Sequence, residues 1–214
     1  MEKIIAKTID FVQEKLHNAE AGHDWFHIQR VWNTAKYINR IEKGNPIVVE
    51  LSALLHDIAD SKFHNGDESL ALEISENYLK QISVSKSIIE EVLFIIKNIS
   101  FKNRHETPEN ISLELKIVQD ADRLDAIGAI GIARTFHFGG FRNSLLYDPS
   151  QPPRLGMSKE EYKKSNGTTI NHFYEKLLFL KDMMNTATGK YLAQERHDFM
   201  LKFLEQFYKE WEGR

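Results

Sequence analysis

The stretch from Val48 to Asp57 reads Val-Val-Glu-Leu-Ser-Ala-Leu-Leu-His-Asp, an apolar run that ends on an adjacent imidazole and carboxylate. The run predicts a buried helix, and a packed helix has no structural use for such a polar pair. A divalent cation would stabilise the pair, because neutral imidazole and ionised carboxylate suit Mn²⁺, Fe²⁺, Ni²⁺, Zn²⁺ or, less readily, Mg²⁺. His56 and Asp57 are therefore candidate metal ligands, and a structural ion pair is the alternative.

A second motif lies in residues 22–31, which read GHDWFHIQRV. The spacing of His27 to Val31 and Ala35 places its side chain on the inward face of a predicted helix. A core histidine bonded to a carbonyl is the ordinary explanation for a lone His in such a place. His23, one turn earlier, competes with His27 as a ligand.

A third motif lies in residues 118–125, which read VQDADRLD. Asp122 is the candidate ligand here, and Asp120 and Asp125 are its rivals. Because each motif falls in a separate helical pattern, three helices are expected to converge on one ion.

The order His, then His-Asp, then Asp resembles the HD-domain metal-dependent phosphohydrolase superfamily. The first motif of that family reads His-x-x-Arg-Val and its last reads Ala-Asp-Arg, as here. The resemblance implies an all-α fold and leaves His23 as a substrate-pocket residue, with Asp120 and Asp125 near the metal or in the pocket. The metal ligands that it implies are His27, His56, Asp57 and Asp122.

Two imidazoles and two carboxylates leave positions open on an octahedral ion for water and a phosphate oxygen. Such an ion would lower the pKa of a bound water and stabilise charge on phosphoryl oxygens. We expect one divalent ion, with Mn²⁺ favoured and Mg²⁺, Fe²⁺, Ni²⁺ or Zn²⁺ as alternatives. Asp57 is then also a catalytic candidate, as part of the metal pair.

Two further catalytic candidates follow the His-Asp pair. Asp60 comes nearly one helical turn after Asp57, where related HD proteins carry the Glu of His-Asp-x-x-Glu, a residue tied to water activation or leaving-group protonation. The Asp of this chain has a shorter reach, and a surface residue at a helix end is the alternative. Lys62 is favoured over His64 for binding phosphate, because it carries a fixed positive charge at pH 7.

The bulk composition fits a globular chain. Its 214 residues are 42% apolar, and 28 Lys+Arg against 31 Asp+Glu give a net charge of −3. We therefore expect no nucleic-acid or membrane partner, only a small phosphorylated substrate. The absence of cysteine excludes disulfides and thiolate sites, and the sequence shows neither a signal-peptide core nor a membrane-spanning run, so a cytoplasmic location is the default.

Helical periodicity predicts an HD-domain helical bundle with a C-terminal helical lobe. The boundaries between the predicted helices are supported by local signals. These are Pro46, Asp67 and Ser85 near helix starts and Gly44 after a helix end. We expect helices at 2–17, 25–43, 47–59, 68–82, 86–99, 112–126, 128–141, 169–186 and 189–211. The predicted domains are a core at 1–142, a long loop or lid at 143–168, and C-terminal helices at 169–214 that pack on the core.

The C-terminal part offers cations for a phosphate group. Lys176, Lys181 and Arg196 could line one wall of a cleft, although a solvated helix face is the ordinary explanation for such charges. Arg123 would bond phosphate or brace a metal carboxylate. The run HFYEKLL that begins at His172 resembles the C-terminal region of bacterial HD-family nucleotide pyrophosphohydrolases, which favours a role in substrate binding.

The glycines of GAIG at 128–131 and of Gly139-Gly140 match no phosphate loop and indicate close helix packing or a helix end. The leading functional hypothesis is nucleoside triphosphate pyrophosphohydrolysis by a metal-activated water. A nucleoside monophosphate phosphatase or a nucleotide phosphodiesterase is the alternative enzyme. A metal-containing ligand sensor without turnover is the alternative of another class.

Overall fold

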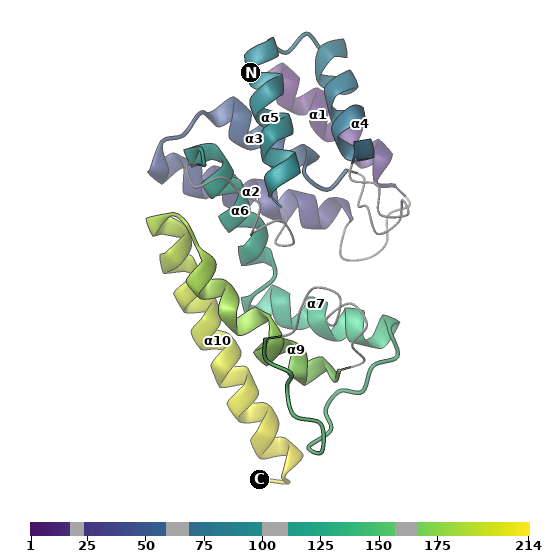
Figure 1. Cartoon of the computed structure of the whole chain (residues 1–214), viewed down its shortest axis with the longest axis vertical. Helices are drawn as coiled ribbons and strands as arrows, with labels where there is room; N and C mark the ends of the chain where they lie inside the picture. Colours follow the sequence, from purple (N-terminus) through teal and green to yellow (C-terminus); the bar gives the residue numbers. More distant parts are fainter. Residues whose placement is uncertain (18–23, 59–68, 100–110, 157–166) are drawn as a thin grey trace. The chain divides into compact units, whose positions relative to one another are not determined.

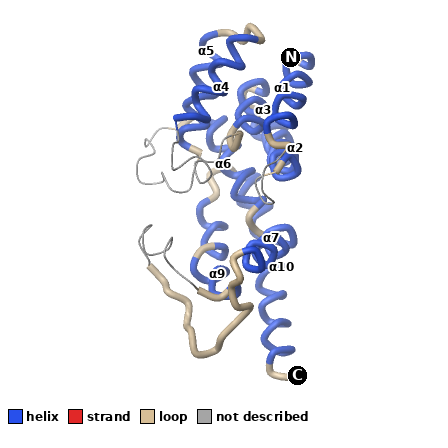
Figure 2. Tube along the Cα trace, turned by 90° about the vertical axis from the view of Figure 1, so that its right-hand side faces the viewer, coloured by secondary structure: helices blue, strands red, loops and turns tan. Residues whose placement is uncertain are grey.

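The computed structural model describes residues 1–17, 24–58, 69–99, 111–156 and 167–214. Within these ranges every regular element is a helix, which confirms the all-α prediction (Figure 2). In chain order they are α1 (Glu2–Lys15), α2 (Trp25–Glu42), α3 (Pro46–Leu55), α4 (Ser69–Gln81), α5 (Lys86–Asn98), α6 (Leu113–Asp125), α7 (Gly128–Phe141), α9 (Thr169–Glu175), the 3-10 helix η3 (Leu177–Met183) and α10 (Ala187–Trp211) (Figure 1).

The predicted helix boundaries follow recognisable local signals. Pro46 is the first residue of α3, and the side chain of Asn45 caps this helix by accepting a backbone N–H at 3.3 Å. Ser85 occupies the N-cap position of α5 without a side-chain capping bond. Gly44 follows the end of α2, whose cap residue has φ 69°. Asp67 lies outside the described residues.

The prediction of a single helix at 169–186 is wrong. The chain leaves α9 at Lys176, where φ −144° and ψ −56° interrupt the helix, and continues as η3. Leu177 and Leu180 are both 2% exposed. Their spacing of three residues places them on one face of a 3-10 helix, which has three residues per turn, so apolar burial fits this tighter geometry.

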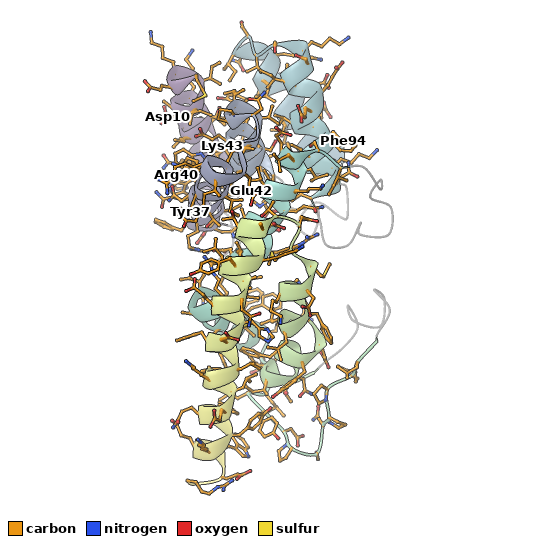
Figure 3. The ribbon with its side chains drawn as sticks, turned by 90° about the vertical axis from the view of Figure 1, so that its left-hand side faces the viewer. Asp10, Tyr37, Arg40, Glu42, Lys43 and Phe94 are labelled. Atoms are coloured by element: carbon orange, nitrogen blue, oxygen red, sulfur yellow. The ribbon has the colours of Figure 1, made fainter. Side chains whose placement is uncertain are left out.

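Contacts divide the chain into two compact units, Met1–Asp122 and Arg123–Arg214. In the first unit α3 is central: it contacts α1, α2 and α5, and α4 packs on α5. Seven of the ten residues of α3 are buried, as its apolar run predicts. The outer face of α2 carries Tyr37 and Arg40, whose guanidinium lies 5.3 Å from the Tyr37 ring centroid (Figure 3).

In the second unit α10 contacts α7 and η3, and α9 contacts α7 and η3. The rings of Phe136, Phe173 and Phe203 pack against one another within this unit, with centroid separations of 5.8–6.2 Å. The division after Asp122 differs from the predicted domain boundary at 142, because α7 takes its contacts from α9 and α10. The domain organisation of 1–142, 143–168 and 169–214 stays a prediction.

The expected long loop is partly described. Residues 142–156 and 167–168 contain no helix or strand, and the rest of the predicted lid lies outside the described residues. In the part of the chain that the structure describes, no helix is both long enough and apolar enough to cross a membrane.

Candidate metal centre

Four polar side chains from three elements of the first unit converge. His27 is in the first turn of α2, and Asp122 is in the last turn of α6. His56 is the C-cap of α3, and Asp57 follows it in a turn. Consecutive helical residues point about 100° apart, and at the end of α3 both side chains can reach one ion that lies between these two directions.

Two hydrogen bonds hold α6 in place beside α3 and α5. The Glu114 side chain accepts the backbone N–H of Asn45 at 2.7 Å, at the start of α3. Near the other end, the Gln119 amide donates to the Asn98 carbonyl at 2.9 Å, where α5 ends. Asp122 is thus carried by a helix that is anchored on both neighbours.

The donor atoms lie at distances suited to a shared ion. His27 Nε2 is 3.6 Å from Asp122 Oδ1 and 4.0 Å from Asp57 Oδ2, and His56 Nε2 is 3.7 Å from Asp122 Oδ1. Donor atoms of His27, His56 and Asp57 lie within 4.8 Å of one another. With metal–ligand distances of about 2.1 Å, neighbouring donors of an octahedral site are about 3.0 Å apart and opposite donors about 4.2 Å. The three distances of 3.6, 3.7 and 4.0 Å fall between these values.

The hydrogen bonding of His56 fits a metal ligand. Its Nδ1 lies 2.9 Å from the Ala53 carbonyl oxygen, which can only accept, so Nδ1 carries the hydrogen. In the neutral ring Nε2 then holds a lone pair. This nitrogen is buried, has no hydrogen-bond partner among the described residues, and faces the Asp122 carboxylate. Two acceptors in this position require a proton or a cation between them, so the residues fit a divalent ion.

The electrostatics agree with this geometry. Burial lowers the pKa of His56, but the Asp122 and Asp57 carboxylates and the Ala53 carbonyl outweigh it and raise the pKa to about 9. Burial raises the pKa of Asp122, but the imidazoles of His56 and His27 outweigh it and lower the pKa to about 2. The carboxylates thus attract positive charge to the point where the four side chains meet.

Two contributors to this site had no role in the sequence prediction. The Ala53 carbonyl fixes the tautomer of His56, and no sequence pattern predicts that contact. The Asp24 side chain accepts the backbone N–H of His27 at 2.9 Å. An Asp directly before an amphipathic helix is the ordinary N-cap signal, so this second contact was predictable.

Three predicted site residues, His23, Asp60 and Lys62, lie outside the described residues. Of the rivals of Asp122, Asp120 is fully buried on α6. Asp125 is also buried, and in the second unit it pairs with Arg134, whose Nη1 lies 2.6 Å from its Oδ2.

The other candidate substrate residues have partners within the second unit. Arg123 donates to the Met183 carbonyl, and Arg196 donates to the Leu124 carbonyl. The stem of Arg196 also packs against Gly128, which has φ +75° and leaves no room for a Cβ. These bonds connect the end of α6 with η3 and α10, and a role of the two arginines in substrate binding stays a prediction.

Lys176 and Lys181 lie on either side of the first turn of η3. Lys176 is close enough to His172 to lower its pKa, although burial is the larger cause of that shift. Lys181 is 28% exposed at its side chain, 3.8 Å from the Asp182 carboxylate, and it lowers the pKa of His197, again after burial. Both lysines thus have an imidazole nearby.

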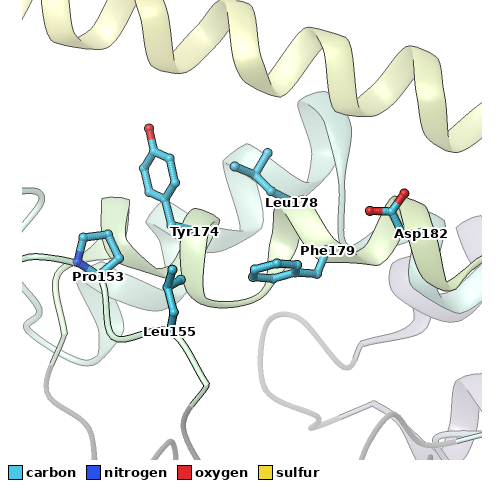
Figure 4. A pocket seen from close by; sticks show the side chains of 6 residues that line it. All are labelled: Pro153, Leu155, Tyr174, Leu178, Phe179 and Asp182. Carbon is cyan, nitrogen blue, oxygen red and sulfur yellow. The ribbon is translucent and has the colours of Figure 1, made fainter.

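A surface pocket of about 360 Å³ lies beside these residues in the second unit. Among the described residues that line it, most are apolar and one, Asp182, is acidic (Figure 4). The described residues that line it include no cation. They are Pro153, Leu155, Tyr174, Leu178, Phe179 and Asp182.

Comparison with known proteins identifies the family. The family model described as the HD domain matches residues 25–127, a range that contains all four converging side chains. The Bacillus subtilis protein YpgQ is 42% identical over 206 residues, which cover 95% of this chain and 91% of YpgQ. The chain belongs to the HD-domain family.

Solved structures of similar proteins agree with this assignment. A Bacillus thuringiensis protein described as an HD-superfamily hydrolase is 43% identical, with a TM-score of 0.80 over 100% of this chain and 99% of that chain. A Lactobacillus plantarum protein has a TM-score of 0.84 at 37% identity, with the same coverage. YpgQ in complex with ADP has a TM-score of 0.75 at 36% identity and covers 96% and 97% of the two chains. This HD-domain chain is a metal-dependent phosphohydrolase.

Proposed function

We propose that this HD-domain protein is a nucleoside triphosphate pyrophosphohydrolase that uses one divalent ion, with Mn²⁺ favoured. In the proposed reaction water adds to the α-phosphorus, the bond to the β-phosphate oxygen breaks, and nucleoside monophosphate and pyrophosphate are released. The observation that carries the proposal is the convergence of two imidazoles and two carboxylates, in which the buried Nε2 of His56 faces Asp122 at 3.7 Å. The proposed ligands are His27, His56, Asp57 and Asp122.

A bound divalent ion would supply Lewis acidity toward phosphoryl oxygens and lower the pKa of a coordinated water. The protein contributes two neutral ligands and two negative ones, whose charges balance a 2+ ion. The contact from the Ala53 carbonyl keeps the Nε2 lone pair of His56 available. We assign to Asp60 the proton of the attacking water, and to Lys62 a phosphate oxygen.

The nucleotide as substrate rests on two observations. One is the resemblance of the C-terminal sequence to nucleotide pyrophosphohydrolases. The other is that the similar protein YpgQ forms a complex with ADP. The triphosphate specificity would come from Lys176 and Lys181, since each additional phosphate adds charge for a cation to bind.

The test is turnover of a nucleotide panel by chelator-treated protein reloaded with Mn²⁺, Mg²⁺ or another single metal. Triphosphates, diphosphates, monophosphates and cyclic nucleotides are compared, and phosphate and pyrophosphate are quantified separately. We expect monophosphate and pyrophosphate in equal amounts from triphosphates. Asp57→Ala should abolish turnover, whereas Asp10→Ala, which removes an exposed carboxylate on α1, should not.

Other products would change the assignment. Phosphate release from monophosphates would indicate the phosphatase, and opening of cyclic nucleotides would indicate the phosphodiesterase. Metal binding without turnover of any nucleotide would favour the ligand sensor.

A further inference from the structure

His27 lies in the first turn of α2, which begins at Trp25. Burial of apolar side chains in α2 begins at Ile28, which is fully buried together with Val31 and Ala35. On the other side of His27, Phe26 is 62% exposed and Trp25 is half-buried. The first turn of a helix also lacks internal acceptors for its N–H groups and tends to fray.

Asp24 compensates for this with two hydrogen bonds. Its side chain accepts the backbone N–H of His27 at 2.9 Å, and its carbonyl accepts the N–H of Ile28 at the longer distance of 3.3 Å. Asp24 has the extended backbone of an N-cap residue, with φ −82° and ψ 174°. The shorter of the two bonds is thus the one to the backbone of His27.

The position of His27 matters because it is the only one of the four converging side chains that α2 provides. The others come from the end of α3 and from α6. A frayed first turn of α2 would therefore move one donor atom while the other three stayed in place. Fraying of one helical turn costs little folding free energy, but the loss of one donor atom weakens metal binding strongly.

We propose that Asp24 is a positioning residue for the metal centre, acting through its hydrogen bond to the His27 backbone and not through its charge. The inference rests on the proposed metal function. An asparagine can make the same bond from its side-chain oxygen, and alanine cannot. Asp24→Ala should therefore weaken metal binding, and Asp24→Asn should restore it.

The size of the effect follows from the strength of helix caps. Loss of an N-cap corresponds to roughly a 2- to 30-fold change in the equilibrium that it controls. We expect Asp24→Ala to raise the dissociation constant for Mn²⁺ by about this factor, and Asp24→Asn to stay within about 2-fold of the parent. Exchange of the His27 amide hydrogen should accelerate in Asp24→Ala and return toward the parental rate in Asp24→Asn.

The experiment titrates Mn²⁺ calorimetrically into chelator-treated full-length protein and measures thermal unfolding of the same samples without metal. Asn45→Ala is the matched control: it removes the N-cap of α3, a helix whose opposite end carries His56. This variant should lose thermal stability comparably yet keep its Mn²⁺ affinity. The split between affinity and stability distinguishes positioning from general destabilisation.

Three outcomes overturn the inference. Parental Mn²⁺ affinity in Asp24→Ala would show that the cap does not position His27. Equal weakening in Asp24→Asn and Asp24→Ala would assign the effect to the carboxylate charge. Weakening in Asn45→Ala to the same degree would assign it to stability. Absence of Mn²⁺ binding by the parent would overturn the proposed function itself, which the other three results leave intact.

Discussion

A single imidazole, that of His56, shows most clearly what this site is built to hold. One ring nitrogen is fixed by the Ala53 carbonyl, and the other faces the Asp122 carboxylate across 3.7 Å. The first contact would also suit a core histidine, but the second places two acceptors against each other when the ring is neutral. The residue types in the motif suggest a cation, and the arrangement of these atoms supports that interpretation.

The lysines of the second unit lead to a prediction about substrate charge. Lys176→Ala and Lys181→Ala should each raise KM for a triphosphate more than for a monophosphate. A hydrogen bond to a charged group contributes roughly 1.5–3 kcal/mol, or about 10- to 150-fold in affinity. Steady-state kinetics with both substrates measures the contrast, and Lys202→Ala, which changes an exposed lysine of α10, is the control. Near-parental KM values for both substrates would show that these lysines do not bind the substrate and belong to a solvated helix face.

His172 should make the stability of the protein depend on pH. Burial, and secondarily the charge of Lys176, lowers its pKa to about 3 from the ordinary 6.5. The unfolded chain therefore binds a proton below about pH 6.5 that the folded chain does not, so stability is full above that pH and is lost as pH falls toward 3. One proton corresponds to at most about 1.4 kcal/mol of unfolding free energy per pH unit.

Denaturant unfolding between pH 7 and pH 4.5 measures this dependence. His172→Gln should flatten the curve over this range. Lys176→Gln should reduce its slope only at the acid end of the range, because removal of the cation raises the folded pKa of His172 part of the way toward 6.5. Parallel curves for the parent and His172→Gln would mean that His172 does not contribute.

At the scale of elements, α7 depends on close approach of its first turn to the preceding chain. A Cβ on Gly131 would lie 2.3 Å from the backbone carbonyl oxygen of Ala126, whereas a Cβ on Gly140 would meet nothing within 4 Å. We expect Gly131→Ala to destabilise the protein by about 1–3 kcal/mol. Gly140→Ala, in the same helix, should be neutral or stabilise by up to about 1 kcal/mol through helix propensity.

Thermal unfolding of these two variants separates packing from helix propensity. If both alanines stabilise, the backbone near Ala126 shifts without cost, and the close packing expected from the glycine pattern is absent. If both destabilise equally, the effect does not come from the contact with Ala126.

The elements also show how far the sequence determines the fold. The continuous apolar run of α3 and the periodicity of α2 are sufficient to predict buried helices, because burial depends on residue spacing alone. The break at Lys176 could not be predicted this way, since Leu177 and Leu180 satisfy an α-helical and a 3-10 pattern almost equally. The order of the three motifs in the sequence predicts the candidate ligands. The tautomer of His56 could not be predicted, because it depends on the position of the Ala53 carbonyl in the folded backbone.

The whole molecule should be stabilised by the ion that it binds. All four proposed ligands lie in the unit Met1–Asp122, so binding should couple to the folding of that unit. A free metal concentration 100 times the dissociation constant adds about 2.7 kcal/mol to the unfolding free energy. Calorimetric unfolding of chelator-treated protein with and without Mn²⁺ should show this rise in the parent and in Asp10→Ala, and no rise in Asp57→Ala. A similar rise in Asp57→Ala would place the stabilising ion elsewhere.

The most direct test of the central claim is anomalous diffraction, at the manganese edge, from crystals of the chain soaked in Mn²⁺. We expect one strong anomalous peak within about 2.0–2.4 Å of His27 Nε2, His56 Nε2 and one carboxylate oxygen each of Asp57 and Asp122. A peak bound by other residues, or the absence of a peak at these four side chains in a protein whose turnover requires Mn²⁺, would contradict the assignment of this site as the metal centre.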